Sequence, residues 1–109
     1  MILGRIGTFA VTQERFNQWD WSRDMRQQDN WEAHAAFIDE LTEQGFIVLG
    51  GPLGDARRVL LIVEADDEPS IRERFAADPW IGTHLRIERI EPWNVLIRGR
   101  RESGHLNGR

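Results

Sequence analysis

Two short apolar runs, separated by a glycine-rich connection, constrain the fold of this 109-residue chain more than any other feature. Residues 46–49 read Phe-Ile-Val-Leu and residues 59–63 read Val-Leu-Leu-Ile-Val. Short apolar runs rich in β-branched residues, the first of them ended by Gly-Gly-Pro at 50–52, are typical of buried strands. The turn expected over 53–57 predicts that the two strands form a hairpin. Because both runs are apolar on both sides, each face of the resulting sheet needs a cover.

Two helices are expected around this hairpin. The first begins at Asp29 as its N-cap, with Glu32 in the capping-box position, runs to about residue 44 and stops at Gly45. The second covers 68–77 and is amphipathic. We expect this helix to turn Ile71, Phe75 and Ala76 toward the sheet.

Further strands are expected at both ends of the chain. Residues 2–11 alternate loosely, and residues 85–90 alternate clearly between apolar and charged side chains. Pro92 is expected to interrupt the last strand, with 93–97 continuing as an edge segment. The polar stretch 12–28 carries several large apolar side chains and is expected to be a long loop that folds over part of the molecule.

The order of elements is therefore β-α-β-β-α-β, which predicts the α+β, ferredoxin-like fold. This fold is a four-stranded antiparallel sheet with both helices on one face. A second copy of the chain is the simplest cover for the other face, so we expect a homodimer. Residues 1–97 are expected to form one domain. Residues 98–109 carry four arginines against one glutamate, and we expect them to be a mobile basic tail.

Composition excludes several classes of function. The net charge is −4, and the chain outside the basic tail is more acidic still, which argues against a nucleic-acid partner. No apolar run is long enough to cross a membrane, and no signal peptide is evident, so no membrane partner is expected. The absence of cysteine excludes disulfides and thiolate chemistry and fits a cytoplasmic protein. The three histidines show no metal-ligand spacing and no phosphate-binding glycine motif occurs, so neither a metal nor a cofactor is expected.

One histidine lies on the apolar stripe of the first predicted helix. His34 follows Trp31 by three residues and precedes Phe37 by three, so the three side chains share one face. An imidazole on a packing face is partly withdrawn from water and is well suited to proton transfer near neutral pH. The plainer interpretation is a core histidine bonded to a backbone carbonyl or a water, and the residue alone favours it. The other two histidines, His84 and His105, carry no predicted role.

Asp78 also has two interpretations. An aspartate before a proline is typical of an N-cap, and Pro79 suits the first position of the short helical turn expected there. The same carboxylate can orient an imidazole and raise its basicity.

A set of short matches carries a resemblance to a known family. The matching residues are His34, Phe37, Leu41, Gly45, Gly51-Pro52-Leu53, the Ala77-Asp78-Pro79-Trp80 segment and Glu91-Pro92-Trp93. In this order they resemble the YCII-related family, whose members are small dimeric α/β-barrel proteins. The resemblance implies a histidine–aspartate pair at His34 and Asp78. Because the first helix and the turn after the second helix share one face of the sheet in this topology, we expect these two side chains to meet, directly or through one water. One branch of the family resembles dehydrochlorinases of chlorinated hydroxyaromatics, and the Trp-bearing segment 12–28 departs from the shorter family pattern.

Two hypotheses of function follow, from different classes. In the first the protein is a cofactor-independent lyase or isomerase of a small molecule, with His34 as acid/base and Asp78 as its partner. In the second it is a non-catalytic dimeric module that binds a small ligand or a protein in the same cleft. Four further residues are candidates for the wall of that cleft: Trp31, Gly51, Pro52 and Trp80. The plainer interpretation makes the tryptophans core or dimer contacts and the Gly-Pro pair the end of a strand.

Overall fold

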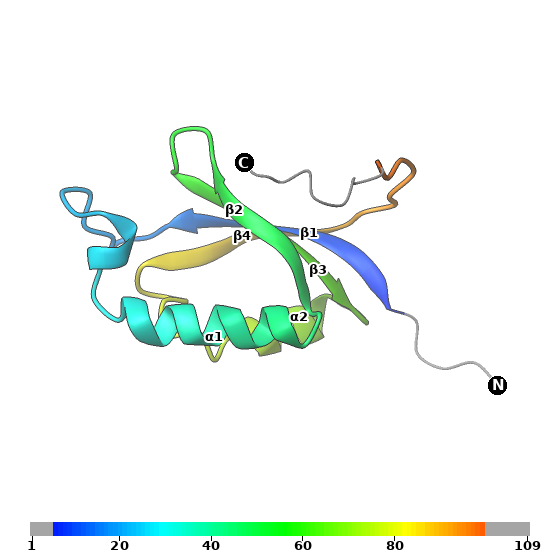
Figure 1. The fold of residues 1–109 in the computed structure, drawn as a ribbon, viewed down its shortest axis with the longest axis horizontal. Coiled ribbons are helices and arrows are strands. Elements are labelled where there is room, and N and C mark those ends of the chain that lie inside the picture. The colour runs from blue at the N-terminus through cyan, green and yellow to red at the C-terminus, as the bar shows by residue number, and fades with distance from the viewer. Residues whose placement is uncertain (1–5, 100–109) are drawn as a thin grey trace, which may run out of the picture.

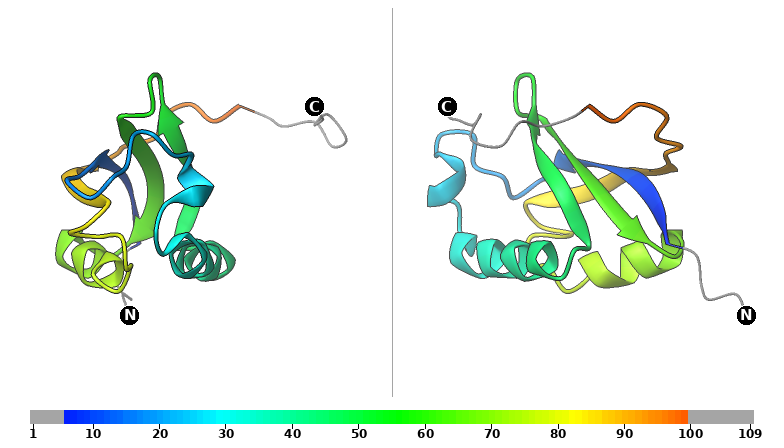
Figure 2. Two further views of the ribbon diagram at one scale, coloured as in Figure 1. Left: turned by 90° about the vertical axis from the view of Figure 1, so that its left-hand side faces the viewer. Right: turned by 45° about the vertical axis from the view of Figure 1, so that its right-hand side comes forward.

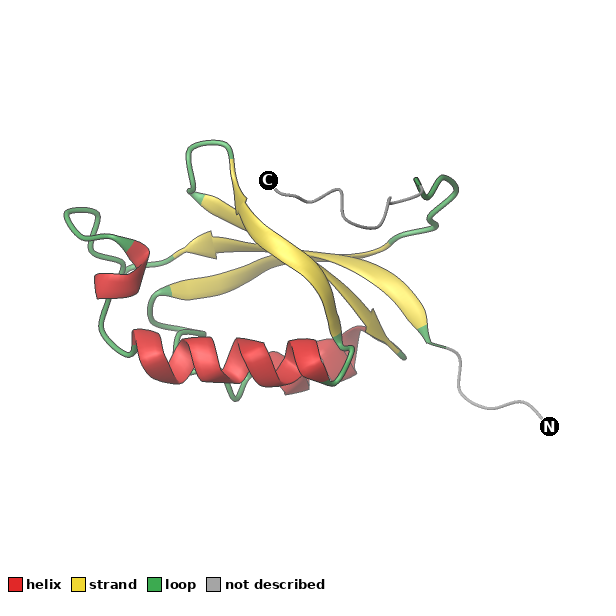
Figure 3. Ribbon diagram, in the orientation of Figure 1, coloured by secondary structure: helices red, strands yellow, loops and turns green. Residues whose placement is uncertain are grey.

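The computed structural model describes residues 6–99 as one sheet with two helices packed against it (Figure 1, Figure 3). The elements in chain order are β1 (Gly7–Arg15), the 3₁₀ turn η1 (Met25–Gln27), α1 (Trp31–Glu43), β2 (Ile47–Leu53), β3 (Arg58–Ala65), α2 (Glu68–Phe75) and β4 (Leu85–Pro92). The strands lie in the order β2-β3-β1-β4 and every neighbouring pair is antiparallel. The predicted α+β, ferredoxin-like fold is confirmed.

Both helices cover the same face of the sheet, as Figures 1 and 2 show. On that face Val11 of β1 lies opposite Leu61 of β3 and Ile90 of β4, and all three are buried. From α2 the predicted inward residues Ile71 and Phe75 are fully buried, whereas Ala76 is exposed because α2 ends at Phe75. The burial of these alternating apolar residues is the main force that holds the layers together.

The first strand is displaced from its predicted position. The sequence pattern predicts a strand over 2–11, but β1 covers Gly7–Arg15 and continues pairing through Gln13 and Glu14. The polar side chains do not end the strand because the outward-facing Glu14 pairs with Arg86 of β4. Residues 1–5 lie outside the described part of the chain. The loop expected over 12–28 therefore begins at Phe16.

This loop is ordered by one glutamine. The buried side chain of Gln28 donates to the carbonyl oxygens of Asp20 and Arg23 at 2.7 and 3.1 Å, and it accepts from the Asp20 amide at 3.0 Å. Trp19, 9% exposed, packs edge-on against Trp80 with ring centroids 5.4 Å apart. The loop thus folds over the end of the helical layer, as the aromatic content of the stretch predicts.

The start of α1 differs from the prediction. The N-cap is Asn30, in the left-handed conformation at φ 65°, and no side chain caps the helix. Asp29 is not the cap because its carbonyl oxygen accepts a hydrogen bond from the indole of Trp80 at 2.8 Å, which holds it one residue outside the helix. At the other end α1 stops at Glu43, and Gly45 takes the positive φ of 81° that a glycine after a helix provides.

The second strand runs through the segment that is predicted to end it. Instead of stopping before the Gly-Gly-Pro segment, β2 continues to Leu53, and Pro52 lies opposite Val59. Proline is tolerated here because β2 is an edge strand, where one side needs no backbone donor. Gly50 is required for close approach, since a side chain there would collide with that of Leu61.

The end of the sheet also differs from the prediction. Pro92 belongs to β4 and lies opposite Phe9, but residues 93–97 form no strand. The Trp93 amide makes one further hydrogen bond, to the carbonyl oxygen of Thr8 at 2.8 Å, before the chain leaves the sheet. The basic tail lies outside the described residues from 100 onward. Among the described helices, none is long and apolar enough to span a membrane.

Candidate active site

His34 occupies the first turn of α1 and faces the sheet. Its backbone amide donates to the carbonyl oxygen of Asn30 at 3.0 Å, and the residue is only 9% exposed. The ring lies parallel to the indole of Trp80, with centroids 4.0 Å apart and planes 10° from parallel. His34 thus lies on the packing face of α1, as predicted, and stacking on Trp80 fixes the plane of its imidazole.

Asp78 lies in the turn after α2, and its side chain is fully buried. One carboxylate oxygen accepts a hydrogen bond from the backbone amide of Trp80 at 2.9 Å, so Asp78 does hold the turn that follows it. The short helical turn expected there is a hydrogen-bonded turn in which the Ile81 amide donates to the carbonyl oxygen of Asp78 at 3.1 Å. The two carboxylate oxygens also lie 2.9 and 3.0 Å from Nδ1 of His34. The expected approach of His34 and Asp78 is therefore direct, and capping and contact coexist.

This contact selects the form of the imidazole. A carboxylate only accepts hydrogen bonds, so the proton must reside on Nδ1 of His34. In the neutral ring Nε2 is then the unprotonated nitrogen, which is the form a general base requires. Asp78 does not line the cavity itself but lies behind the ring of His34.

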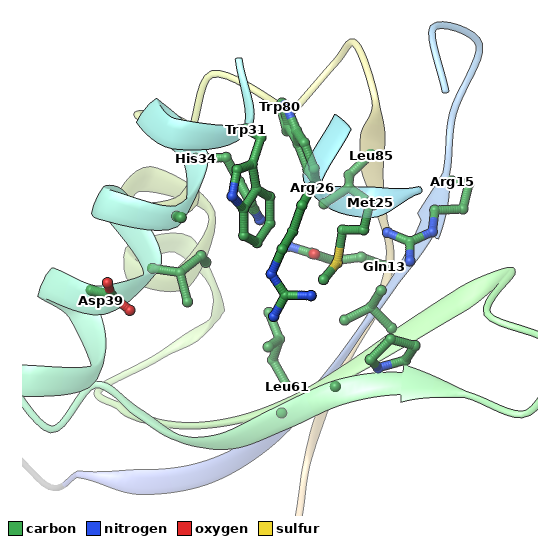
Figure 4. Close-up of a pocket in the computed structure, with 16 residues that line it drawn as sticks. Gln13, Arg15, Met25, Arg26, Trp31, His34, Asp39, Leu61, Trp80 and Leu85 are labelled. Atoms are coloured by element: carbon green, nitrogen blue, oxygen red, sulfur yellow. The ribbon is translucent and has the colours of Figure 1, made fainter. Parts of the chain in front are cut away.

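A pocket of about 430 Å³ opens beside His34, between α1, β1, β2 and η1 (Figure 4). Its size is that of a site for a small organic molecule. Most of its walls are apolar. The lining residues are Gln13, Arg15, Met25, Arg26, Trp31, His34, Ala35, Ile38, Asp39, Gly50, Gly51, Pro52, Val59, Leu61, Trp80 and Leu85.

The four predicted wall residues all line this pocket. Trp31 is half-buried with its ring 5.9 Å from that of His34, whereas Trp80 is fully buried and also belongs to a second core cluster with Trp19. A methyl group added at Gly51 would meet no atom within 4 Å, so Gly51 faces open space. The tryptophans therefore combine the two interpretations, because they pack in the interior and border the cavity.

The sequence did not predict the other lining residues, among them Gln13, Arg15, Met25 and Arg26. A strand extended past residue 11 would have turned Gln13 and Arg15 to the same face as Val11, so strand alternation carried the signal. Arg15 is held by a hydrogen bond from Nε to the carbonyl oxygen of Ala56 at 2.9 Å. Burial lowers the pKa of Arg15 from its ordinary value.

The third aromatic neighbour of this site is His84, for which the sequence pattern predicted no role. It is buried, stacks on Trp80 at 5.1 Å and contacts the Thr83 hydroxyl through Nδ1 at 3.1 Å. Desolvation lowers the pKa of His84, and the charge of Asp29 partly opposes this. Within residues 6–99, no three His, Cys, Asp or Glu side chains cluster as a metal-binding set.

The fold and site define a small ferredoxin-like protein with a buried histidine–aspartate pair at the edge of an apolar pocket. The YCII-related domain model matches residues 8–94, and the chain belongs to this family. No curated protein matches the chain. A solved structure titled as the structural-genomics protein YJCS is similar with a TM-score of 0.47 and 13% identity, covering 84% of this chain and 100% of that one.

Proposed function

We propose that the protein is a small-molecule enzyme of the lyase or isomerase type in which His34 transfers protons and Asp78 orients it. The observation that carries the proposal is the contact of Nδ1 with the buried carboxylate at 2.9 Å, while the ring borders a pocket. In this arrangement Nε2 of His34 takes a proton from a carbon of the substrate. An isomerase returns that proton at another atom, and a lyase loses a leaving group from the neighbouring carbon.

The chemistry needs no cofactor, because a neutral imidazole is both base and, once protonated, acid. Stacking on Trp80 and the bond to Asp78 fix the ring before substrate binds, which lowers the cost of reaching a reactive geometry. The apolar walls exclude water from the proton acceptor.

The experiment replaces His34→Asn and measures turnover and melting temperature on the same protein. Candidate substrates are found by exchange of carbon-bound hydrogen for deuterium in heavy water, observed by NMR. Asn keeps hydrogen bonding but cannot transfer a proton near neutral pH, so we expect a loss of about 10²–10⁴-fold in rate with the fold retained. Asp78→Asn should also lower the rate, because its amide oxygen can still accept from the Trp80 amide but its NH₂ group then faces Nδ1 and favours the tautomer with the proton on Nε2. A destabilised His34→Asn protein with unchanged turnover would refute the catalytic role.

The apolar walls of the pocket favour a second candidate, the non-catalytic binding module. In that case His34 and Trp31 are contact surfaces only. The same variant separates the two: a binding module shows no hydrogen exchange in any ligand, with either the parent protein or His34→Asn.

We further propose that the protein acts as a homodimer, joined through the sheet face opposite the helices. That face carries Leu60 of β3, which is partly exposed and lies opposite Thr12, and the edge-strand residue Leu49, which is 62% exposed. A second copy would cover these side chains by the symmetric packing of one sheet against the other.

A further inference from the structure

The pocket beside His34 has a polar end that the histidine–aspartate pair does not use. Gln13 and Arg15 reach it from β1, and Arg26 reaches it from η1. In Figure 4 the guanidinium of Arg26 lies over the cavity, and the amide of Gln13 lies between His34 and Arg15. These three polar side chains can therefore make hydrogen bonds with a molecule in the pocket.

Gln13 is an unpaired polar group in an apolar setting. It is 2% exposed, and its buried amide nitrogen makes no hydrogen bond to any atom of residues 6–99. Its partners in the sheet register are the apolar residues Val59 and Ile87. An apolar side chain would fit this place on β1 without leaving a buried donor unpaired, so the amide needs an explanation. Half a turn of the amide presents its NH₂ group to the cavity, where a ligand oxygen can accept from it.

The two arginines are held in place without being neutralised. The guanidinium carbon of Arg15 lies 3.8 Å from the ring centroid of Trp19, and that of Arg26 lies 5.6 Å from the centroid of Trp31. Neither arginine pairs with a carboxylate of the described chain, whereas five other arginines there do. Aromatic stacking orders a guanidinium and leaves its N–H groups to bind an anion.

One acidic residue also lines the pocket, and it narrows the choice of anion. Asp39 comes from α1, and in Figure 4 it lies on the far side of His34 from Arg15. With two arginines against one aspartate, the lining carries one net positive charge when His34 is neutral. That balance favours an anion of single charge at the arginine end, and planar guanidinium groups match a planar carboxylate.

We propose that the substrate is a flat, largely apolar molecule with one carboxylate, which Arg26, Arg15 and the Gln13 amide bind. This rests on the proposed function and deepens it. The carboxylate end fixes the register of the molecule, its apolar body lies against Trp31 and Leu61, and its reacting carbon comes to Nε2 of His34. The polar end selects the substrate, and the histidine acts on it.

The test measures binding of benzoate and of its neutral isostere benzamide, by NMR shifts of the tryptophan indole signals and by tryptophan fluorescence. We expect benzoate to bind at least about tenfold more tightly than benzamide, the usual gain from a charge-assisted hydrogen bond. Arg26→Gln should remove about this factor for benzoate and leave benzamide unchanged. The matched control is Arg23→Gln. Arg23 lies three residues before Arg26, is exposed and pairs with Asp20, so its replacement removes the same charge from outside the pocket.

Gln13 is tested with two variants of similar size. Gln13→Leu should weaken benzoate binding without lowering the melting temperature, because it removes a buried unpaired amide and keeps the packing. Gln13→Glu should weaken benzoate further by repulsion and leave benzamide little changed. If Gln13 were only structural, Gln13→Leu would leave the preference for benzoate over benzamide unchanged.

The proposal is overturned if benzoate and benzamide bind equally or not at all, or if Arg23→Gln and Arg26→Gln weaken benzoate to the same extent. His34→Asn keeps this test separate from that of the proposed function. It should retain the preference for benzoate over benzamide, because both compounds meet the same altered wall at residue 34. Failure of benzoate selectivity in the parent protein refutes the carboxylate end alone, and unchanged turnover in His34→Asn refutes the acid/base role alone.

Discussion

At the scale of single residues, Trp80 joins the structural and chemical parts of this protein. Its indole N–H holds Asp29 outside α1, its backbone amide holds Asp78, and its ring stacks on His34. The site is therefore built around a residue that also fills the interior. A change at Trp80 should disturb stability first and the orientation of His34 with it.

Trp80→Ala should lower the free energy of unfolding by about 3–5 kcal/mol, the usual cost of removing a buried aromatic side chain. Trp80→Phe retains most of the packing and should cost less, about 1 kcal/mol for the lost hydrogen bond plus the smaller ring. Urea denaturation followed by circular dichroism measures both. The control is Trp93→Ala, since Trp93 is 47% exposed. Equal losses at the two tryptophans would contradict the central role of Trp80.

His84 should make the stability depend on pH. Because burial holds its pKa in the folded protein below the ordinary value of 6.5, the unfolded chain binds the proton first as the pH falls. The contribution of neutral His84 to the stability of the fold is fully present when the pH is above the ordinary pKa of 6.5. It is lost as the pH falls from there through the lower pKa of His84 in the folded protein. Melting temperatures between about pH 7 and about pH 5 should fall less steeply for His84→Phe, which keeps a ring against Trp80. An unchanged slope would assign the pH dependence to another group.

At the scale of elements, the edge strand β2 forms one wall of the pocket. Its backbone approaches β3 closely at Gly50, and one residue later Gly51 faces open space. Two adjacent glycines thus have different roles. The pattern of apolar residues predicted a strand here but not its continuation, because the packing of Gly50 against Leu61 depends on the neighbouring strand.

Gly50→Ala should destabilise the protein by about 1–3 kcal/mol, since the new methyl group collides with Leu61 and lies 3.0 Å from the carbonyl oxygen of Leu60. Gly51→Ala is the matched control and should be neutral or slightly stabilising, because its methyl group meets no atom within 4 Å. Thermal unfolding of both variants decides the matter, and the opposite ranking would show that β2 is placed differently.

At the scale of the whole molecule, the two faces of the sheet differ in their cover. The helices bury one face, and the other presents Leu49 and Leu53, which are 62% and 45% exposed. Charged residues of β4 such as Arg89 and Glu91 border this apolar area. An apolar centre with a charged border is the usual composition of an interface.

Leu49→Glu should therefore shift the proposed homodimer toward the monomer, because it would bury a charge within the apolar part of the interface. Sedimentation velocity over a range of concentrations measures this. Ala36→Glu, on the exposed side of α1, provides the control and should leave the mass unchanged. A parent protein that sediments as a monomer at micromolar concentration would end the dimer proposal.

The sequence alone determined the fold class and the two residues at the centre of the candidate site. Helical and strand periodicity reflect which side chains face the core, so the order of elements and the placement of His34 on the packing face of α1 could be derived locally. The pairing with Asp78 was implied by the family resemblance, and the topology, which puts both residues on one side of the sheet, predicted that they meet.

Only the tertiary structure decided the rest of the pocket. Gln13 and Arg15 line the pocket because β1 continues to pair beyond the end of its apolar pattern at Val11. Arg26 lines it because contacts of Gln28 and Trp19 fold the loop back over the helical layer. Asp29 is not the N-cap of α1 because its carbonyl oxygen accepts a hydrogen bond from Trp80, which lies 51 residues away in the chain. Such contacts depend on groups that are distant in sequence, and local propensity carries no information about them.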